Sequence, residues 1–467
     1  MKKKTLVVGA GIGGRFVVEQ LQSTDKSKYT VIGILDDDLR KRSLLGVPII
    51  GKIEELQRCI IKLKIQHVVL AIPTLDIKKQ QTIINEISKM KITYYVLPSV
   101  FSTAQSQQAA VPVLDYSKLL VGREEFALDY KSVKENFQNK TILITGAGGS
   151  IGSEIAKQVF LCNPKCLILL GHGEGSIYKI DMDLRAVQEK LNQSTEIITI
   201  IADIRDEETI NRVFEEQQPN IIYHAAAHKH VPLMESNIYE AFSNNVIGTH
   251  NVLQAAKISK ANQFIMISTD KAVNPSNNMG ATKRLAEKLT LSMNDLDGLC
   301  CNVVRFGNVL GSRGSVFPKL WEQLHNYVPL TITDPNMKRY FMTIPEASKL
   351  VIEASLLEKP NAIFVLDMGE QLCLSDMVDE LICLAGKNKE DIPINYVGIR
   401  PGEKMKEELF NDNEGAKKIS EKLFEGHYFT SLADLNMIYT LMLTYKREPV
   451  KKLQEQIIQQ ANVTEIG

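Results

Sequence analysis

Short apolar runs alternate with amphipathic stretches along the first hundred residues of the chain. Four runs have the length of buried strands, and a helical pattern from Arg15 to Leu21 follows the first of them. The four apolar runs occupy residues 5–11, 29–38, 67–73 and 92–98. This alternation predicts a parallel sheet with helices on its faces. From Ser102 to Gln138 the apolar periodicity lapses, which predicts a connection and one short helix.

A second α/β series begins near residue 140. Its apolar runs again have strand length, and they begin at residues 141, 166, 198, 220, 263 and 302. We therefore predict an α/β protein of two Rossmann-like domains with parallel sheets, the second with a small C-terminal substrate subdomain. The expected boundaries are 1–125 for the first domain, 126–138 for a linker, 139–440 for the second domain and 441–467 for a C-terminal helix or tail.

Composition limits the classes of protein that fit this pattern. A chain of 467 residues is too long for one compact core, and a net charge of zero offers no global basic surface to nucleic acid. No apolar run approaches the ~18 residues that span a bilayer, and the N-terminus reaches glycines too soon for a secretory signal. We therefore expect a cytoplasmic protein without a transmembrane segment.

Cysteine and histidine usage gives no reason to expect a metal site. Seven cysteines without a CxxC pair argue against both a disulfide framework and a structural zinc site. His224, His228 and His230 cluster after an apolar run, but the sequence places no cysteine or carboxylate ligand near them.

A glycine-rich turn follows the first predicted strand. Gly9, Gly11 and Gly14 form a GxGxxG pattern there, and Asp36 ends the second strand. Such glycines let the backbone approach a pyrophosphate, and the acid can bind a ribose hydroxyl, so we predict a nucleotide site. Alternatively, the glycines serve only tight packing of strand and helix.

A second and more specific glycine pattern opens the second domain. Gly146, Gly149 and Gly152 form TGxxGxxG between a strand and a helix. The backbone amides after Gly146, including those of Ser150 and Ile151, would bind the pyrophosphate of a dinucleotide at the helix N-terminus.

Three side chains with acid–base capacity follow the strand that begins at residue 263. Thr269, Asp270 and Lys271 arrive together at its carboxyl end, which is where ligands bind in open α/β sheets. A helical pattern starts at Met279 and places Lys283 one turn later on the same face.

This arrangement resembles the catalytic segment of the extended short-chain dehydrogenase/reductases. In that family a Ser or Thr on the strand end faces a Tyr and a Lys four residues apart on the next helix. Here Met279 takes the place of the Tyr. Tyr130 and Lys134 have the same spacing, but they precede the first strand of the second domain and cannot reach its carboxyl edge.

Basic residues gather in the loops downstream of this segment. Arg305, Asn308 and Arg313 occupy a glycine-rich loop, and Arg339 and Arg400 follow. Each arginine alone is more often a solvated charge, but together they predict a nucleotide-diphosphate-sugar site. The predicted substrate residues are His230, Asn308, Arg313, Gly314, Val316, Arg339, Arg400 and Glu403.

Several motifs of the second domain together resemble the CapD-like polysaccharide biosynthesis proteins. They are TGAGGSIGSE, AAAHKHVP, STDKAVNPSNNMGATKR, RFGNVLGSRGSV, ITDPNMKRYFMTIPEA and RPGEKMKEEL. Within this family the chain resembles the UDP-N-acetylglucosamine 4,6-dehydratases over about residues 138–425, and Met279 is typical of the branch that retains configuration at carbon 5. The N-terminal part resembles the CoA-binding-like domain of the longer members, which usually begin with transmembrane helices.

The resemblance implies NAD as cofactor, with NADP left open. Gly171 stands where many relatives have the acid that binds the adenine ribose, and Glu174 is the nearest substitute. Asp203 would contact adenine, and Asn245 would orient the active-site lysine. The full set of implied cofactor residues is Gly146, Gly149, Ser150, Ile151, Gly152, Glu174, Asp203, Ile204, Ala225, Ala226, Ala227, Asn245, Ser268 and Lys283.

The reaction implied is an internal redox elimination by a lyase of bacterial surface polysaccharide or glycan biosynthesis. Lys283 would bind the nicotinamide ribose, and Asp270, Thr269 or a water would be the first base, because Met279 has no proton to exchange. Lys271, with a pKa lowered by burial, would take the proton of carbon 5, and Asp270 would protonate the leaving hydroxyl. An ion pair between Asp270 and Lys271 is the structural alternative.

Two other functions stay open at this stage. A UDP-sugar 4-epimerase shares the fold and the first hydride step, and a non-catalytic sugar-nucleotide sensor would have lost activity with its Tyr. In each case the ligand is UDP-N-acetylglucosamine or a related nucleotide-sugar, and relatives suggest a homo-oligomer, a dimer or larger.

Overall fold

The computed structural model describes most of the chain. The described residues are 3–23, 29–38, 42–72, 83, 86–87, 90, 92–96, 114–120, 123, 126–293, 298–326, 328–357, 359–360, 362–427 and 431–463. The chain divides into two compact units. One comprises Met1–Asp115, Trp321–Leu330 and Asp379–Pro393, and the other comprises Tyr116–Leu320, Thr331–Val378 and Ile394–Gly467.

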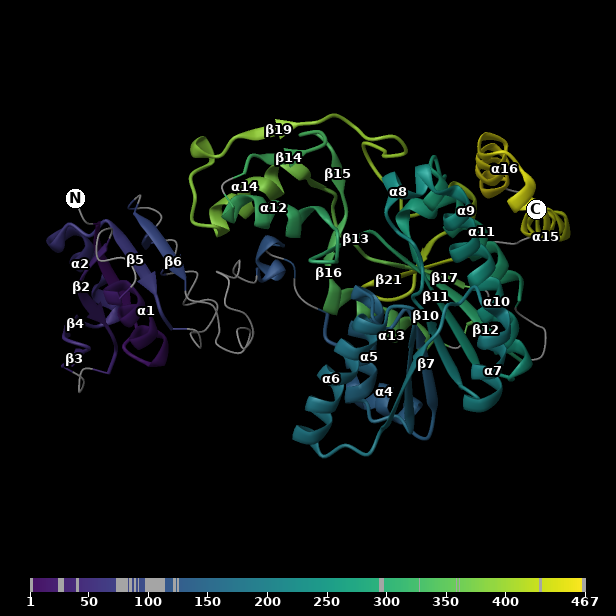
Figure 1. Cartoon of the computed structure of the whole chain (residues 1–467), viewed down its shortest axis with the longest axis horizontal. Helices are drawn as coiled ribbons and strands as arrows, with labels where there is room; N and C mark the ends of the chain where they lie inside the picture. Colours follow the sequence, from purple (N-terminus) through teal and green to yellow (C-terminus); the bar gives the residue numbers. More distant parts are fainter. Residues whose placement is uncertain are drawn as a thin grey trace. The chain divides into compact units, whose positions relative to one another are not determined.

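The N-terminal part of the chain forms a sheet whose strand order is β3-β4-β2-β1-β5-β6 (Figure 1). All described neighbours are parallel except β3 and β4. The elements are β1 (Lys3–Val8), α1 (Ile12–Ser23), β2 (Tyr29–Leu35), β3 (Ser43–Leu44), β4 (Val47–Gly51), α2 (Leu56–Leu63), β5 (His67–Leu70) and β6 (Thr93–Val96). The four strands expected from the apolar runs are confirmed as β1, β2, β5 and β6.

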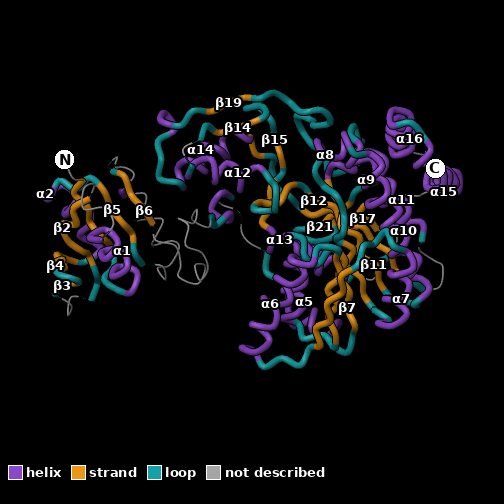
Figure 2. The backbone as a smooth tube through the Cα atoms, in the orientation of Figure 1, coloured by secondary structure: helices purple, strands orange, loops and turns teal. Residues whose placement is uncertain are grey.

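The second unit is built on a larger sheet, with the order β20-β21-β17-β12-β11-β10-β7-β8-β9 among the described residues (Figure 2). Its strands are β7 (Thr141–Thr145), β8 (Cys166–Gly171), β9 (Glu196–Ile201), β10 (Ile221–His224), β11 (Gln263–Thr269), β12 (Cys300–Phe306), β17 (Ala362–Leu366), β20 (Lys417–Lys418) and β21 (Leu423–His427). In this sheet the neighbouring strands β17, β12, β11, β10, β7, β8 and β9 run parallel. Strand β21 is antiparallel to β17 and was not predicted from the sequence. The α/β class with two Rossmann-like parallel sheets is confirmed.

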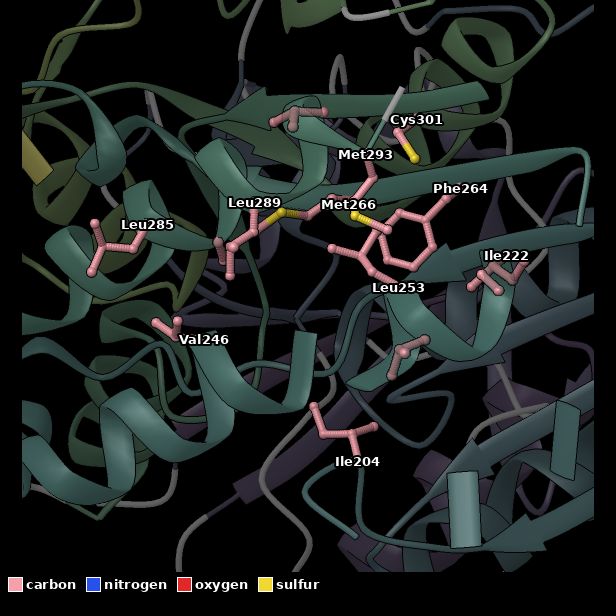
Figure 3. Close-up of a cluster of buried hydrophobic side chains, with 14 of the residues drawn as sticks. Ile204, Ile222, Val246, Leu253, Phe264, Met266, Leu285, Leu289, Met293 and Cys301 are labelled. Carbon is pink, nitrogen blue, oxygen red and sulfur yellow. The ribbon is translucent and has the colours of Figure 1, made fainter. Parts of the chain in front are cut away.

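Helices cover both faces of this sheet (Figures 1 and 2). One face packs on α4 (Tyr130–Phe137), α5 (Ser150–Leu161), α6 (Glu174–Leu191) and α13 (Ile344–Ser355). The other packs on α7 (Glu207–Gln217), α9 (Ile238–Phe242), α10 (Gly248–Ile258), α11 (Asn278–Ser292), α15 (Leu432–Thr444) and α16 (Val450–Asn462). Figure 3 shows part of this second core, where Phe264 and Met266 of β11 contact Leu253 of α10 and Leu289 of α11.

Further short elements lie in the segments that follow β10 and β12. They are α8 (Val231–Ser236), β13 (Asn308–Leu310), α12 (Val316–His325), β14 (Leu330–Ile332), β15 (Lys338–Arg339), β16 (Phe341–Thr343), β18 (Leu372–Cys373), α14 (Leu374–Leu384) and β19 (Ile394–Tyr396). Within the second unit β13 pairs with β16 and β15 pairs with β18. The first of these pairs brings residues 308–310 and 341–343 together, although the two segments are far apart in sequence.

The ends of the second unit bear on the expected domain boundaries. Asp129 caps α4, and Val133 and Phe137 of this helix are buried in the core of the second unit. Residue 440 lies within α15, and Leu453 and Ile457 of α16 are buried. The boundaries at 125, 138 and 440 stay a prediction. No helix within the described residues has both the length and the apolar character needed to cross a membrane.

Candidate active site

The turn between β7 and α5 has the form that a pyrophosphate cradle requires. Gly146 has φ +65°, and a Cβ there would lie 2.7 Å from the backbone nitrogen of Ala226. A Cβ on Gly152 would lie 2.3 Å from the Gly146 carbonyl oxygen. Side chains are therefore excluded at both positions, and the backbone amides at the start of α5 stay accessible to an anionic group. This turn fits the dinucleotide expected from the sequence.

A cavity of about 620 Å³ opens at the carboxyl edge of the parallel strands. Its lining combines the cofactor turn, the end of β11, the start of α11 and the loops after β10 and β12. The predicted residues that line it are Gly149, Ser150, Ile151, Gly152, Ala225, Ala227, His230, Ser268, Thr269, Lys271, Met279, Lys283, Asn308, Arg313, Gly314, Val316, Arg339, Arg400 and Glu403. One cavity thus holds both the predicted cofactor residues and the predicted substrate residues.

Some predicted residues do not line this cavity. They are Gly146, Glu174, Asp203, Ile204, Ala226, Asn245 and Asp270. The carboxylate of Asp203 is bound by Arg205, with an Nη2–Oδ2 distance of 2.6 Å, and this hydrogen bond lowers the pKa of Asp203. An adenine contact by the Asp203 side chain would compete with this pair.

Asn245 supports the active-site helix by a different contact from the one expected. It lies in a π-helical turn, Ser243–Ile247, of the kind that often marks functional sites. Its Nδ2 donates to the Thr282 hydroxyl at 3.1 Å and to the His228 carbonyl at 3.1 Å. The expected orientation of Lys283 by Asn245 would therefore act through the neighbouring Thr282.

The last residue of β11, Thr269, and the two residues after it form a compact polar group. Asp270 Oδ1 accepts hydrogen bonds from the Thr269 hydroxyl and from Lys271 Nζ, both at 2.9 Å, and Lys271 Nζ also donates to Asn308 Oδ1 at 2.9 Å. Thr269 and Lys271 face the cavity, whereas Asp270 is fully buried. The ion pair considered as an alternative is thus present. To act as a base in this pair, Lys271 would first have to give a proton to Asp270.

Lys283 lies beside this group on α11 and is almost completely buried. Its Nζ donates to the Ile267 carbonyl at 2.7 Å. Burial lowers the pKa of Lys283 to about 8, although Glu287 opposes this effect. Met279, one turn earlier, is also buried and lines the cavity, so a thioether occupies the position of the usual Tyr.

The buried ammonium of Lys283 should make the nucleotide-free protein less stable below pH 8. Between pH 8 and 10.5 the unfolded chain binds more protons at this lysine than the folded chain does, so the free energy of unfolding rises with pH. The full effect is on the order of 3 kcal/mol. We expect Lys283→Met to melt at a higher temperature than wild type at pH 7, and the difference to shrink by pH 10.5. A pH-independent difference would contradict this interpretation.

Beneath the site lies a buried group of four charges, Arg284, Glu287, Arg305 and Glu414. Arg305 binds Glu287 through Nε and Nη2 at 2.7 and 2.6 Å, and Glu414 through Nη1 and Nη2 at 2.7 and 2.9 Å. Burial alone would raise the pKa of Glu287, but the two arginines hold it at about 2. Glu287 also accepts from the Ser268 hydroxyl at 2.5 Å, which connects the charged group to the cavity wall.

The position of Arg305 corrects one expectation. The glycine-rich sequence around it predicts a loop suited to a diphosphate, but Arg305 belongs to β12 and is fully buried. Arg339 also has a structural part: its guanidinium donates to the carbonyls of Lys338, Met405 and Lys404. Arg313 and Arg400 remain as exposed cations of the cavity wall.

Three charged residues that line the cavity, Lys229, Lys319 and Glu407, were missed from the sequence. Lys229 donates to the Ser312 hydroxyl at 3.2 Å, and burial, helped by Lys271 and Arg313, lowers its pKa. Glu407 is 4% exposed. A buried carboxyl at position 407 could not be separated in sequence from the surrounding surface-like run KMKEEL.

The predicted N-terminal nucleotide site has a tight glycine turn, and the carboxylate of Asp36 already accepts hydrogen bonds within the protein. Gly9 has φ +105°, and a Cβ on Gly14 would lie 1.9 Å from the Gly9 carbonyl oxygen. Asp36 accepts from the Ala10 amide at 2.5 Å and from the Asp38 amide at 2.8 Å. The acid therefore stabilises the turn itself, and the nucleotide site there stays a prediction.

The histidine that ends β10 and the two histidines that follow the strand make separate contacts. His224 is buried between the hydroxyls of Thr145 and Thr249, both at 2.9 Å, and burial lowers its pKa to about 3. His228 contacts Glu240 at 3.0 Å, and His230 lines the cavity. Within the described ranges, no cluster of three or more His, Cys, Asp or Glu side chains is arranged to hold a metal ion.

Comparison with known proteins decides the family. Residues 142–427 match the family described as polysaccharide biosynthesis protein, and residues 1–98 match the CoA-binding domain. The chain belongs to the polysaccharide biosynthesis protein family. It is 43% identical over 469 residues to the capsular polysaccharide biosynthesis protein CapD of Staphylococcus aureus, and the match covers 97% of this chain and 76% of the relative. The resemblance inferred from the motifs is confirmed.

Solved structures agree with the fold of the second unit of this family member. The X-ray structure of Pen from Bacillus thuringiensis has a TM-score of 0.57 and 34% identity, and the match covers 62% of this chain and 89% of that one. UDP-glucose 4-epimerase of Thermus thermophilus, solved with NAD, has a TM-score of 0.50 and 20% identity, covering 58% and 90%. The second domain therefore has the extended short-chain dehydrogenase/reductase fold.

Proposed function

We propose that this protein is an NAD-dependent nucleotide-sugar 4,6-dehydratase that acts on UDP-N-acetylglucosamine in polysaccharide biosynthesis. The observation that carries the proposal is the cavity itself: it joins the glycine cradle at the start of α5 to Thr269, Lys271 and Lys283. A hydride acceptor and a sugar held in one enclosed space can exchange a hydride without release of an intermediate.

The chain's own residues would hold the cofactor along the carboxyl edge of the sheet. The turn from Gly149 to Gly152 would bind the pyrophosphate, and Ala225 and Ala227 leave room for the dinucleotide to pass close to the backbone. Lys283 is near enough to the end of β11 to bind the nicotinamide ribose. When bound, the dinucleotide would take a hydride from carbon 4 of the sugar and return it to carbon 6. NADP stays open, because Gly171 and Glu174 do not decide between the two.

The substrate would lie against the loops on the other side of the cavity. Arg313 and Arg400 supply positive charge for the diphosphate, and Asn308 and His230 supply hydrogen-bonding groups. Near the sugar, the ammonium of Lys283 would stabilise the negative charge that develops on the oxygen of carbon 4. Lys271 would give a proton to Asp270 and then, as the neutral amine, take the proton of carbon 5.

Mass spectrometry of the sugar product tests this function. Purified protein incubated with UDP-N-acetylglucosamine should give a product that has lost one water. A product of unchanged mass that differs only in configuration at carbon 4 would identify an epimerase instead. Tight binding without any product would identify a non-catalytic sensor.

The cofactor assignment has its own expected result. Because residues of the loops that follow β12 line the same cavity as the cradle, we expect the protein to retain its dinucleotide through purification. Denaturing the protein and analysing the supernatant by liquid chromatography should release NAD or NADP in near-stoichiometric amount. Gly152→Val would place a side chain against the Gly146 carbonyl, so this variant should release little or none.

A further inference from the structure

We propose that Tyr116 is a positioning residue that holds the substrate loop in its binding conformation. The substrate loop, residues 311–314, carries Arg313 into the cavity wall. The inference rests on the proposed function, which assigns this loop to the diphosphate of the substrate. It adds a residue from far earlier in the chain, between the N-terminal sheet and β7, whose own side chain does not line the cavity.

The substrate loop has a sequence that does not hold one conformation by itself. Gly311 and Gly314 both have positive φ, +76° and +68°, and Arg313 between them is exposed. Glycine loses more conformational freedom on ordering than any other residue. If the folded protein orders such a loop beforehand, the loss is not incurred when the ligand binds, and the affinity is higher.

Contacts on the cavity side connect the loop to the other parts of the site. The Arg313 amide donates to the Ser150 hydroxyl of the cofactor turn at 3.1 Å, and Lys229 Nζ donates to the Ser312 hydroxyl at 3.2 Å. Ser150 and Lys229 themselves line the cavity. The loop therefore has polar support from the side on which the ligand binds.

Tyr116 supports the loop at its first glycine. A Cβ on Gly311 would lie 2.5 Å from Cδ2 and 2.6 Å from Cε2 of the Tyr116 ring. The half-buried ring thus lies directly against the backbone of Gly311, in the space that a side chain there would need. Movement of the loop toward this side is blocked as long as the ring stays in place.

The segment that carries the ring is anchored to the second unit. Arg123 follows the 3₁₀ turn Tyr116–Leu119 by a few positions, and its Nε donates to both carboxylate oxygens of Glu346, at 3.0 and 2.9 Å. Its Nη1 and Nη2 donate to the carbonyls of Met368 and Asp367 at 2.6 and 2.8 Å. An arginine that makes all these bonds fixes the backbone on which Tyr116 stands.

The anchor and the loop are attached to the same pair of strands. Glu346 lies in the first turn of α13, directly after β16. Strand β16 pairs with β13, and the pairing of Thr343 with Leu310 ends where Gly311 begins the loop. This arrangement keeps the anchored segment and the start of the loop at a fixed separation.

Binding of UDP measures the effect of the tyrosine without turnover. Titration calorimetry of the full chain should give a Kd for UDP about 3–10-fold higher in Tyr116→Ala than in wild type, because the loop must then be ordered on binding. The KM for UDP-N-acetylglucosamine should rise by a similar factor, and kcat should change by less than about twofold, since ground state and transition state lose the same contact. Tyr116→Phe keeps the ring and should bind UDP as wild type does. Tyr178→Ala is the matched control, because Tyr178 is an exposed tyrosine of α6.

Gly311→Ala tests the same contact from the side of the loop. In wild type the added methyl meets the ring, whereas in Tyr116→Ala it enters the space that the ring has left. The strain of a positive φ is the same in both backgrounds and cancels in the comparison. Gly311→Ala should therefore weaken UDP binding less in the Tyr116→Ala protein than in wild type. If Tyr116→Ala does not fold, Tyr116→Leu takes its place in both comparisons, since its side chain is also smaller than the ring.

The outcomes can be told apart. Three results would each overturn the positioning role: wild-type UDP affinity in Tyr116→Ala, a loss in Tyr116→Phe as large as in Tyr116→Ala, or independent effects in the double variant. A lower melting temperature and kcat with unchanged KM would also overturn it, because a purely structural contact gives that pattern. UDP binding by wild type without any dehydrated product would overturn the dehydratase function alone. A wild-type protein that does not bind UDP would overturn both proposals.

Discussion

Replacing Lys271 by Gln should stop the reaction after oxidation of carbon 4. The amide keeps a hydrogen-bond donor for Asp270 and Asn308 but has no basic nitrogen to take the proton of carbon 5. Loss of a positioned general base lowers a rate by about 10²–10⁴-fold. We therefore expect reduced nicotinamide to build up on the protein, measured by its near-ultraviolet absorbance, while no dehydrated sugar is released.

Isotope exchange tests the base role of Lys271 directly. Without the base, the hydrogen of carbon 5 should not exchange with D2O, whereas wild type should exchange it during turnover. Lys406→Gln is the matched control, because Lys406 is an exposed lysine of the segment that carries Glu407. If Lys271→Gln dehydrates the sugar at the wild-type rate, the base lies elsewhere, although the family assignment would stand.

Replacing Arg305 by Met should destabilise the second unit strongly. Arg305 is fully buried and makes four hydrogen bonds to Glu287 and Glu414, so its loss leaves two buried carboxylates with Arg284 as their remaining cation. Breaking a buried ion pair from one side costs about 3–5 kcal/mol. We expect a fall in melting temperature on the order of 10 °C, measured by circular dichroism or calorimetry.

A matched surface pair gives the control for this prediction. Arg185 also bonds both oxygens of one carboxylate, Asp181, at 2.9 Å, but its side chain is 49% exposed. Arg185→Met should therefore change stability by roughly 0.3–0.5 kcal/mol. Equal effects of the two substitutions would show that the buried charges contribute no more than surface charges do.

The parts of the fold that follow from local sequence were predicted well. Strands β7 and β11 are continuous apolar runs, and Gly146 and Gly152 are required by a positive φ and by close backbone contacts. Asn277 caps α11 by accepting from the Gly280 amide, so the helix starts where the pattern changes. Most of these features depend on neighbours in sequence, which a single chain displays directly.

The missed features depend on residues distant in sequence. Arg305 and Arg313 both belong to one basic, glycine-rich stretch, yet one is buried in β12 and the other faces the cavity. The difference arises because Glu414, over a hundred positions later, packs against Arg305. The sequence around a charged residue does not show whether the fold will bury it beside a residue of opposite charge.

The sequence by itself determined the α/β class, the glycine cradle, the group Thr269–Lys271 and the family, because strand periodicity, turn conformation and motif spacing are local properties. Only the tertiary structure decided which charges face the cavity and which are buried beneath it. It closed Lys271 into a pair with Asp270, buried Arg305 against Glu287, and folded the segment 400–407 back onto the cavity so that Glu407 joined the site. The physical reason is that burial and charge pairing depend on long-range packing, which sets the local dielectric and the partners of each group.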